Sequence, residues 1–410
     1  MTRAGGRPMM PGVTPLLGIK VLDLSRVLAG PVCCQVLAEL GADVVKVERP
    51  STGDDTRAWG PPFVPDGGPS AYFASANHSK RSLALDLSQS DGIAVLEDLI
   101  RRADILVENF LPDAAAKYGL TPARLTELNP LLVSCSISGY GRTGPLADRP
   151  GYDLVIQATS GLMSITGEPD GAPMKVGVAI ADVITGLYAA ISTLAGLFAR
   201  IAGRGGSAFD LSLFDCTLAS LVNVAQSSLV TGQRPTRYGN AHAQIVPYQV
   251  FATSDGHLVL AVGNDGQWRQ FCQVAGQANW ANDPKFATNP ARVEHRAELI
   301  ALMQPILATR TTAAWRELLE PTGVPHAPVV PLDVALAAPQ TLARELVVPV
   351  RDGAGREYHV LGSPIHWHDE PRRKVGAPPE LGAHTDEVLR DWIGYDAARI
   401  QTLRQSGVVA

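Results

Sequence analysis

The chain has 410 residues, of which 46% are hydrophobic and 18% are charged, so it is long enough to form two domains around a large buried core. Its formal net charge of −5 argues against a general nucleic-acid-binding protein, which would need a strongly basic face. The five cysteines show no metal-ligand spacing, which predicts no metal site and is typical of a reducing compartment.

The first 234 residues alternate short apolar runs with helical patterns. Strands are predicted at residues 20–24, 44–47, 81–87, 105–108, 131–136 and 209–213. Helices are predicted to end at Leu40 and to span residues 91–102 and 214–231. This strand–helix–strand alternation predicts a parallel sheet in a doubly wound, Rossmann-like α/β domain. The dinucleotide fingerprint GxGxxG does not follow the first strand.

The composition changes after residue 234. Residues 248–253 and 257–262 flank Ser254-Asp255-Gly256, which predicts a β-hairpin. Helices are predicted at 266–276, 291–308 and 311–320, which makes residues 235–335 a smaller α/β domain. The remaining residues, 336–410, contain a strand-like stretch near 347–361 and a helix at 384–393.

The most membrane-like segment runs from Val183 to Ala199. Polar residues and glycines interrupt it, so a buried core helix is favoured over a membrane span. The first twenty residues lack the apolar core and cleavage site of a signal peptide. We therefore expect a cytoplasmic protein with neither a membrane nor a nucleic acid as a partner.

Asp182 stands between a short apolar run and this strongly apolar helix. The residue type alone favours an N-cap for a helix beginning at Val183. A nucleophilic role is compatible with that position, because a helix N-terminus favours negative charge and keeps a carboxylate ionised.

Three segments near Asp182 resemble the catalytic core of the class III CoA-transferases: Gly151-Tyr152-Asp153, Ala181-Asp182 and Thr185-Gly186-Leu187-Tyr188. That superfamily includes formyl-CoA, carnitine and dicarboxylate CoA-transferases and alpha-methylacyl-CoA racemase, and the resemblance extends over nearly the whole chain. It implies a Rossmann-like domain formed by residues 1–234 and 336–410, a smaller domain at 235–335, and a homodimer of interlocked rings.

In the resembling enzymes, the residue matching Asp182 attacks the thioester carbonyl of an acyl-CoA and forms an aspartyl anhydride. The released CoA thiolate then gives an aspartyl-CoA thioester and a free acid, and an acceptor acid repeats these steps in reverse. The resemblance thus implies acyl-CoA and small carboxylic acids as substrates, with coenzyme A as cosubstrate and no tightly bound cofactor. The Ser160–Gly167 stretch favours the dicarboxylate branch, which uses succinyl-CoA.

Two alternatives stay open, a racemase or other isomerase and a non-catalytic acyl-CoA-binding paralogue. The racemase branch carries a histidine where this chain has Tyr152, and it needs two acid/base groups at the alpha carbon. Tyrosine has an ordinary pKa of about 10 and is a poor base at neutral pH, which favours transfer. The presence of Asp182 argues against a non-catalytic paralogue.

The resemblance also implies contacts with coenzyme A. They are expected at Leu28, Ala29, Arg49, Lys80, Arg81, Leu85, Asn109, Phe110, Lys117 and Tyr152. The basic residues among them are suited to the phosphates of the nucleotide. From residue type alone, each basic residue could equally be a solvated surface residue, and Phe110 could be ordinary core.

The oxyanions formed during transfer need hydrogen-bond donors. The expected donors lie in the loop that includes Gly263, Asn264, Gly266 and Gln267, where relatives carry a glycine-rich loop. The alternative is an ordinary turn between a strand and a helix. His242 lies in a second segment that resembles an active-site loop, and we expect it to contact substrate.

Overall fold

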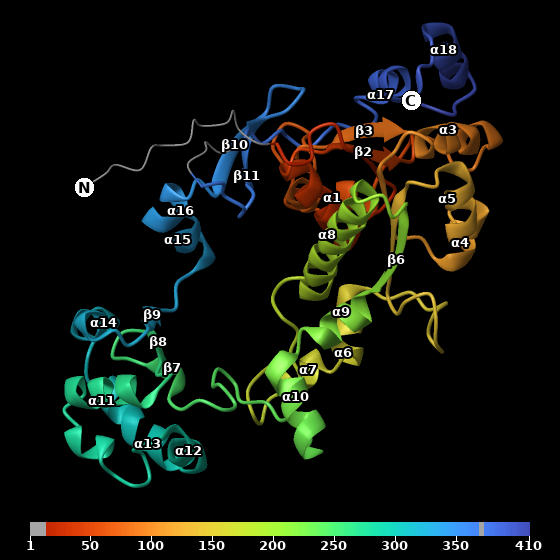
Figure 1. Cartoon of the computed structure of the whole chain (residues 1–410). Coiled ribbons are helices and arrows are strands. Elements are labelled where there is room, and N and C mark those ends of the chain that lie inside the picture. Colours follow the sequence, from red (N-terminus) through yellow and green to blue (C-terminus); the bar gives the residue numbers. More distant parts are fainter. Residues whose placement is uncertain (1–13, 369–372) are drawn as a thin grey trace, which may run out of the picture. The chain divides into compact units, whose positions relative to one another are not determined.

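The computed structural model describes residues 14–368 and 373–410 (Figure 1). The chain divides into two compact units. The large unit comprises residues up to 160 together with 177–220 and 340–410, and the small unit comprises 161–176 and 221–339. Residues 161–176 therefore belong with the small unit, where Arg237 donates hydrogen bonds to the backbone carbonyls of Glu168, Pro169 and Gly171.

The large unit is built on a six-stranded parallel sheet with the strand order β3-β2-β1-β4-β5-β6. The strands are β1 Lys20–Asp23, β2 Asp43–Glu48, β3 Arg81–Ala84, β4 Ile105–Glu108, β5 Val133–Ser138 and β6 Ser207–Ser212. The order reverses between β1 and β4, which is where doubly wound sheets bind their ligands. The predicted α/β class with a parallel sheet is confirmed.

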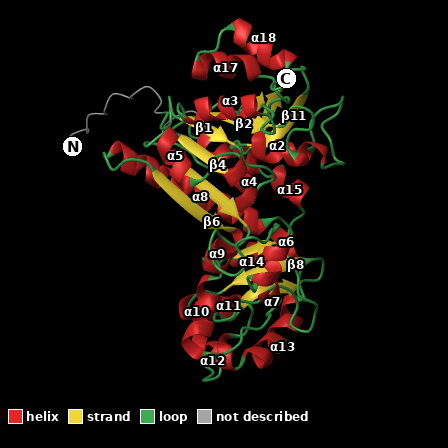
Figure 2. Cartoon of the chain, turned by 90° about the vertical axis from the view of Figure 1, so that its right-hand side faces the viewer, coloured by secondary structure: helices red, strands yellow, loops and turns green. Residues whose placement is uncertain are grey.

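Helices cover both faces of this sheet, as the red helices and yellow strands of Figure 2 show. They are α1 Ala29–Glu39, α2 Ala71–Asn77, α3 Ser90–Ile100, α4 Pro112–Lys117, α5 Pro122–Leu128, α6 Asp153–Thr159, α8 Ile180–Ile201, α9 Leu213–Ala219, α17 Thr385–Ile393 and α18 Ala397–Gln405. A two-stranded antiparallel sheet of β10 Val347–Arg351 and β11 Glu357–Leu361 completes the unit.

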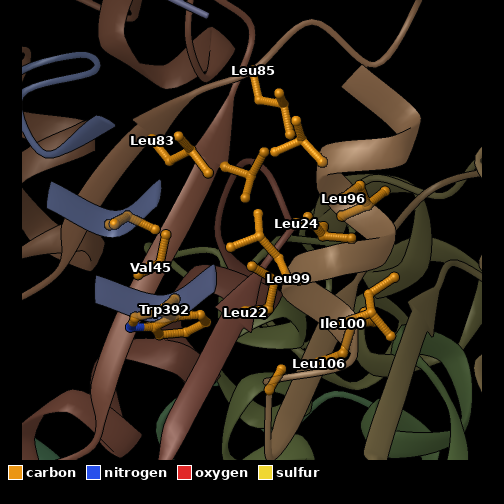
Figure 3. Packing of buried hydrophobic residues seen from close by; sticks show 14 of the residues in the cluster. Leu22, Leu24, Val45, Leu83, Leu85, Leu96, Leu99, Ile100, Leu106 and Trp392 are labelled. Carbon is orange, nitrogen blue, oxygen red and sulfur yellow. The ribbon is translucent and has the colours of Figure 1, made fainter. Parts of the chain in front are cut away.

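Successive residues of a strand point to opposite faces of the sheet, so the large unit has two apolar cores. Leu22 of β1 lies in one core with Leu99 of α3 and Trp392 of α17 (Figure 3). Val21, the preceding residue, lies in the other core with Leu37 of α1 and Ala189 of α8. The second core is the one that fixes α8 and therefore Asp182.

Helix α8 packs against α1 at a glycine. A Cβ atom added to Gly186 would lie 2.6 Å from the backbone oxygen of Ala29 and 2.9 Å from Cβ of Val32. By length and composition α8 could cross a membrane, and α9 with α10 (Val222–Thr231) would be a second span if counted together. Half of the most apolar window of α8 is buried within the structure.

The small unit contains a three-stranded antiparallel sheet with the order β7-β8-β9. Its strands are β7 Tyr248–Ala252, β8 His257–Ala261 and β9 His326–Pro328. Its helices are α7 Leu162–Ile165, α10, α11 Asp265–Val274, α12 Asn289–Glu294, α13 Arg296–Leu307, α14 Thr312–Leu319 and α15 Leu332–Leu336, and α16 Pro339–Ala343 follows at the boundary. The predicted hairpin is present as β7 and β8. The single helix predicted at 214–231 is wrong, because α9 and α10 belong to different units.

Candidate active site

Asp182 is the third residue of α8 and does not cap it. The helix begins at Ile180, and its cap residue Ala179 has no side chain that could accept a hydrogen bond. The carboxylate of Asp153 caps the helix instead, because its Oδ1 accepts the N–H of Ala181 at 2.8 Å. Nε2 of Gln157 donates to the other oxygen of Asp153 at 2.6 Å and holds it in place. The N-cap interpretation of Asp182 is therefore wrong, and its carboxylate is left for another use.

The Asp182 side chain is 8% exposed, and no residue in the described part of the chain donates a hydrogen bond to its carboxylate. Burial, and then the negative charge of Asp153, raise the pKa of Asp182 from 3.8 to about 7. A carboxylate that is neither solvated nor hydrogen-bonded is a stronger nucleophile than one in water. A pKa near 7 also leaves much of it ionised at neutral pH.

The first turn of α1 packs against α8 one helical turn from Asp182. Asp182 and Gly186 are one helical turn apart on the same face of α8, and Gly186 contacts the backbone of Ala29. Leu28, the cap residue of α1, offers no side-chain acceptor to the start of the helix. The N–H groups of Leu28, Ala29 and Gly30 have no acceptor within the described ranges, as is usual for the first turn of a helix.

Tyr72 of α2 is a neighbour of Asp182 that sequence reasoning missed. Burial, and then the charges of Asp182 and Asp153, raise the pKa of Tyr72 to about 12. The hydroxyl therefore stays protonated at neutral pH and can donate a hydrogen bond. The ring of Trp59 packs edge-on against Tyr72 with 5.1 Å between centroids. One signal was available, because Ser70 caps α2 by accepting the N–H of Phe73 and such a cap marks a helix start.

A cavity of about 390 Å³ lies at the carboxyl ends of β1 to β4, where the strand order reverses. Three of the residues expected to contact coenzyme A line it, namely Arg49, Leu85 and Phe110. Arg49 is exposed and its guanidinium has no partner among the residues described. Lys117 is likewise exposed and unpaired in this part of the chain, and it directly precedes Tyr118, which lines the cavity. Two cations are thus available to phosphates here.

Lys80 and Arg81 are committed elsewhere, contrary to the expectation that they bind phosphates. Lys80 is 4% exposed, and Nζ donates to Oδ2 of Asp23, the backbone oxygen of Pro31 and Oδ1 of Asn77, at 2.9, 2.9 and 3.0 Å. An ammonium group has three donors, so none is left for a ligand. Arg81 forms a two-pronged ion pair with Asp43 and a second pair with Glu387.

Asn109 is also occupied. Its amide oxygen accepts the N–H of Arg26 at 2.9 Å, and its amide nitrogen donates to the backbone oxygen of Arg26 at 2.8 Å. The side chain therefore ties the loop after β4 to the loop after β1, and its expected contact with the ligand stays a prediction. Phe110, the next residue, packs edge-on against Tyr118 with 5.2 Å between centroids and forms part of the cavity wall.

Two donors of the loop expected to stabilise oxyanions are hydrogen-bonded within the small unit. The N–H of Gly263 donates to Oε1 of Gln267 at 2.8 Å, and Nε2 of Gln267 donates to the backbone oxygen of Gly323 at 3.3 Å. Oδ1 of Asn264 caps α11 by accepting the N–H of Gln267 at 2.9 Å. Gly266 lies within the first turn of this helix. The segment is thus a turn between β8 and α11, and its expected oxyanion role stays a prediction.

Tyr152 and His242 are placed without a catalytic partner. Tyr152 is 64% exposed and caps α6 immediately before Asp153. His242 lines a cavity of about 430 Å³ in the small unit, where Nδ1 accepts the N–H of Gln244 at 3.0 Å. Within the described residues, no group of three or more His, Cys, Asp or Glu side chains could hold a metal ion. The ligand contacts expected of Tyr152 and His242 stay predictions.

The family model for CoA-transferase family III matches residues 16–385. The chain is 46% identical to the succinate–glutarate CoA-transferase of Agrobacterium fabrum, with 92% of this chain and 95% of the relative covered. It is 39% identical to the human succinyl-CoA:glutarate CoA-transferase, covering 98% and 92%. The crystal structure of a CAIB/BAIF family protein from Brucella suis superposes with a TM-score of 0.80 at 41% identity, covering 92% and 99%.

Proposed function

Because the chain belongs to CoA-transferase family III, we propose that it moves coenzyme A between two carboxylic acids through covalent intermediates on Asp182. The observation that carries this proposal is the state of the Asp182 carboxylate. It is buried, it accepts no hydrogen bond from described residues, and it does not cap α8 because Asp153 does so. Family membership makes the chain a CoA-transferase, and this carboxylate supplies the nucleophile such an enzyme needs.

The reaction begins when an oxygen of Asp182 attacks the thioester carbonyl of an acyl-CoA. The C–S bond breaks, coenzyme A leaves as a thiolate, and an aspartyl anhydride remains. The thiolate then attacks the aspartyl carbonyl, which releases the donor acid as a carboxylate and leaves an aspartyl-CoA thioester. The acceptor carboxylate attacks this thioester, and the thiolate finally attacks the acceptor half of the new anhydride. Asp182 is regenerated, and no bound cofactor is required.

Each step passes through an oxyanion, which needs donors in a fixed position. We place this role on the free N–H groups of Leu28, Ala29 and Gly30 at the start of α1, because they lie beside the helix that carries Asp182. Tyr72 is a further donor near the same carboxylate. In the Gly263–Gln267 loop, the N–H of Gly263 and the amide nitrogen of Gln267 bond within the small unit.

The names of the relatives favour dicarboxylic acids as substrates. Two of them are named for the exchange of coenzyme A between succinate and glutarate. We therefore propose a dicarboxylyl-CoA, such as succinyl-CoA, as donor and a second dicarboxylate as acceptor. The five cysteines are all buried and unpaired, which supports a reducing, cytoplasmic location. The net charge of −5 supports the absence of a nucleic-acid partner.

We expect ping-pong kinetics with succinyl-CoA and a dicarboxylate acceptor, and negligible exchange of the alpha proton. An isomerase needs a second acid/base group, and the histidine of the racemase branch is replaced here by exposed Tyr152. The test incubates purified enzyme in deuterium oxide with a 2-methylacyl-CoA, and separately with succinyl-CoA and a panel of acids. Fast deuterium incorporation without an acceptor, together with no CoA exchange, would replace the transferase proposal by the isomerase alternative.

Alanine at Arg49 or at Lys117 should each weaken CoA binding roughly tenfold, because a charge-assisted hydrogen bond contributes about 1.5–3 kcal/mol. Both cations are unpaired among described residues and lie at or next to the cavity. Isothermal titration with CoA measures the affinity, and Arg124→Ala is the control. Arg124 is partly exposed on the same unit but is paired with Glu97 and Glu127, so its loss should leave CoA affinity unchanged. Equal affinity in all four proteins would remove Arg49 and Lys117 from the CoA site.

We also propose that the protein is a homodimer, in the interlocked form that the family resemblance implies. Support comes from an exposed apolar stripe along α8, since unpartnered patches of this kind mark interfaces. The stripe consists of Leu187, Tyr188, Ile191, Phe198 and Ile201, which are 41–75% exposed. Light scattering should give twice the chain mass of 43.4 kDa. Tagged and untagged dimers should exchange subunits very slowly, because threaded rings separate only by partial unfolding, and rapid exchange would exclude interlocking.

A further inference from the structure

Lys80 joins three elements that meet near Asp182. Its ammonium group donates to Asp23 at the end of β1, to the backbone oxygen of Pro31 in the first turn of α1, and to Asn77 at the end of α2. The distances are 2.9, 2.9 and 3.0 Å, and the side chain is buried. The first turn of α1 is the segment whose free N–H groups lie beside α8. Lys80 is thus bonded directly to the backbone that carries the proposed oxyanion donors.

A second buried lysine fixes the loop that leads into this turn. Lys46 donates to the backbone oxygen of Ser25 and forms an ion pair with Asp54, both at 2.8 Å. Asp54 in turn accepts the N–H of Val27 at 3.3 Å. Asp23, the partner of Lys80, accepts the N–H of Ser25 at 3.0 Å. The backbone of residues 25–31 is therefore fixed by two buried ammonium groups and two buried carboxylates, those of Lys46, Lys80, Asp23 and Asp54.

The backbone in this loop needs such support. Val27 has a φ of 69°, a left-handed conformation that β-branched residues rarely adopt. Gly30 approaches the loop so closely that a Cβ atom there would lie 2.2 Å from Cβ of Ser25. A strained backbone persists only where its surroundings over-determine it, and such positions gather at functional sites.

We propose that Lys80 is a positioning residue for CoA transfer, whose ammonium group fixes the first turn of α1 so that its free N–H groups face the acyl group on Asp182. Lys80 does not touch the substrate, because its three donors are filled within the protein. Its effect reaches the reaction through the first turn of α1, in which the backbone oxygen of Ala29 and the side chain of Val32 lie against α8 at Gly186. The inference rests on the proposed function, since it presupposes the covalent chemistry at Asp182.

The test compares Lys80→Met with a matched control, Arg356→Met. Arg356 belongs to the same unit, is 14% exposed and is ion-paired with buried Asp352, but it has no contact with α1. Both changes leave a carboxylate without its cation and should lower the thermal midpoint. Only Lys80→Met should slow single-turnover acyl transfer to Asp182, by about 100-fold, because a misplacement of about 1 Å has an effect of that size. KM for the acyl-CoA should change less than threefold.

Rates are expressed per active site, with sites counted as the amount of Asp182 trapped at saturating acyl-CoA. A purely structural Lys80 would lose sites and keep its rate per site, and that result would overturn the inference. If Lys80→Met does not fold, the double variant Asp23→Asn/Lys80→Met is used, because it leaves no unpaired charge and Asn can still accept from Ser25. A wild-type rate per site in the double variant would also overturn it. Failure of the wild type to load Asp182 would instead refute the proposed function.

Discussion

Replacing Asp182 with Asn is expected to abolish CoA transfer, lowering kcat by about 10⁴-fold or more, as removal of a catalytic nucleophile does in other enzymes. An amide oxygen cannot form the anhydride. The fold should be retained, because α8 is capped by Asp153 and not by Asp182. The measurement combines the steady-state rate with trapping of wild-type enzyme by hydroxylamine or borohydride after incubation with succinyl-CoA. Peptide mass spectrometry should then find the label on Asp182.

Asp215→Asn is the matched control for this change. Asp215 is also the third residue of a helix in the large unit, but it is exposed, and Ser212 caps its helix. The control should transfer CoA at the wild-type rate and should still load Asp182. If Asp182→Asn also kept the wild-type rate, another residue would have to be the nucleophile, even though the fold and the family assignment would stand.

The position of Asp182 before an apolar helix could be predicted from the sequence. That its carboxylate does not cap the helix could not. A carboxylate before an apolar helix looks like a cap, and the residue type alone favours that interpretation. The actual cap, Asp153, lies 28 residues earlier and reaches the helix only because α6 and α8 pack together. A cap supplied from a distant segment has no local signature. This is why the first turn of α8 begins three residues before the predicted start.

The same limit applies to the basic residues expected to contact coenzyme A. Arg49 and Lys80 look alike as cations near the ends of strands. In the described chain Arg49 is exposed and unpaired, whereas Lys80 is buried and donates hydrogen bonds to three acceptors. The difference comes from Asp23, Pro31 and Asn77, which converge only in the folded chain. The parallel sheet was easier to predict, because strands buried on both faces appear as continuous apolar runs.

For the Gly263–Gln267 loop, a local signal for a helix start was present in the sequence. Asn264 is followed three residues later by Gln267, which is a pattern typical of a helix start. In the structure Asn264 caps α11, and the Gln267 side chain reaches back to the N–H of Gly263. This pattern predicts the start of α11, which the structure confirms.

Asp182→Asn is also expected to stabilise the protein above neutral pH, at the expense of activity. The pKa of Asp182 is raised to about 7 by burial and then by Asp153, so the folded protein holds a proton that the unfolded chain releases near pH 4. Folding stability is therefore unaffected by this group below pH 4, falls as the pH rises from 4 to 7, and stays lowered above 7. Since one pKa unit corresponds to about 1.4 kcal/mol, the full effect is on the order of 4 kcal/mol.

Urea unfolding at pH 5 and pH 8, at one fixed protein concentration, measures this effect. The free energy of unfolding of Asp182→Asn should exceed that of the wild type at pH 8 by a few kcal/mol, and the gap should shrink to less than half at pH 5. Asp215→Asn should show no such gap, because Asp215 is exposed.

The same titration should appear in catalysis as an acid limb near pH 7 in the pH profile of kcat/KM for the acyl-CoA, since only the ionised carboxylate attacks. A gap of equal size at both pH values would mean that the carboxylate is destabilised by packing and not by its charge. The pH dependence of activity would then have to come from another group.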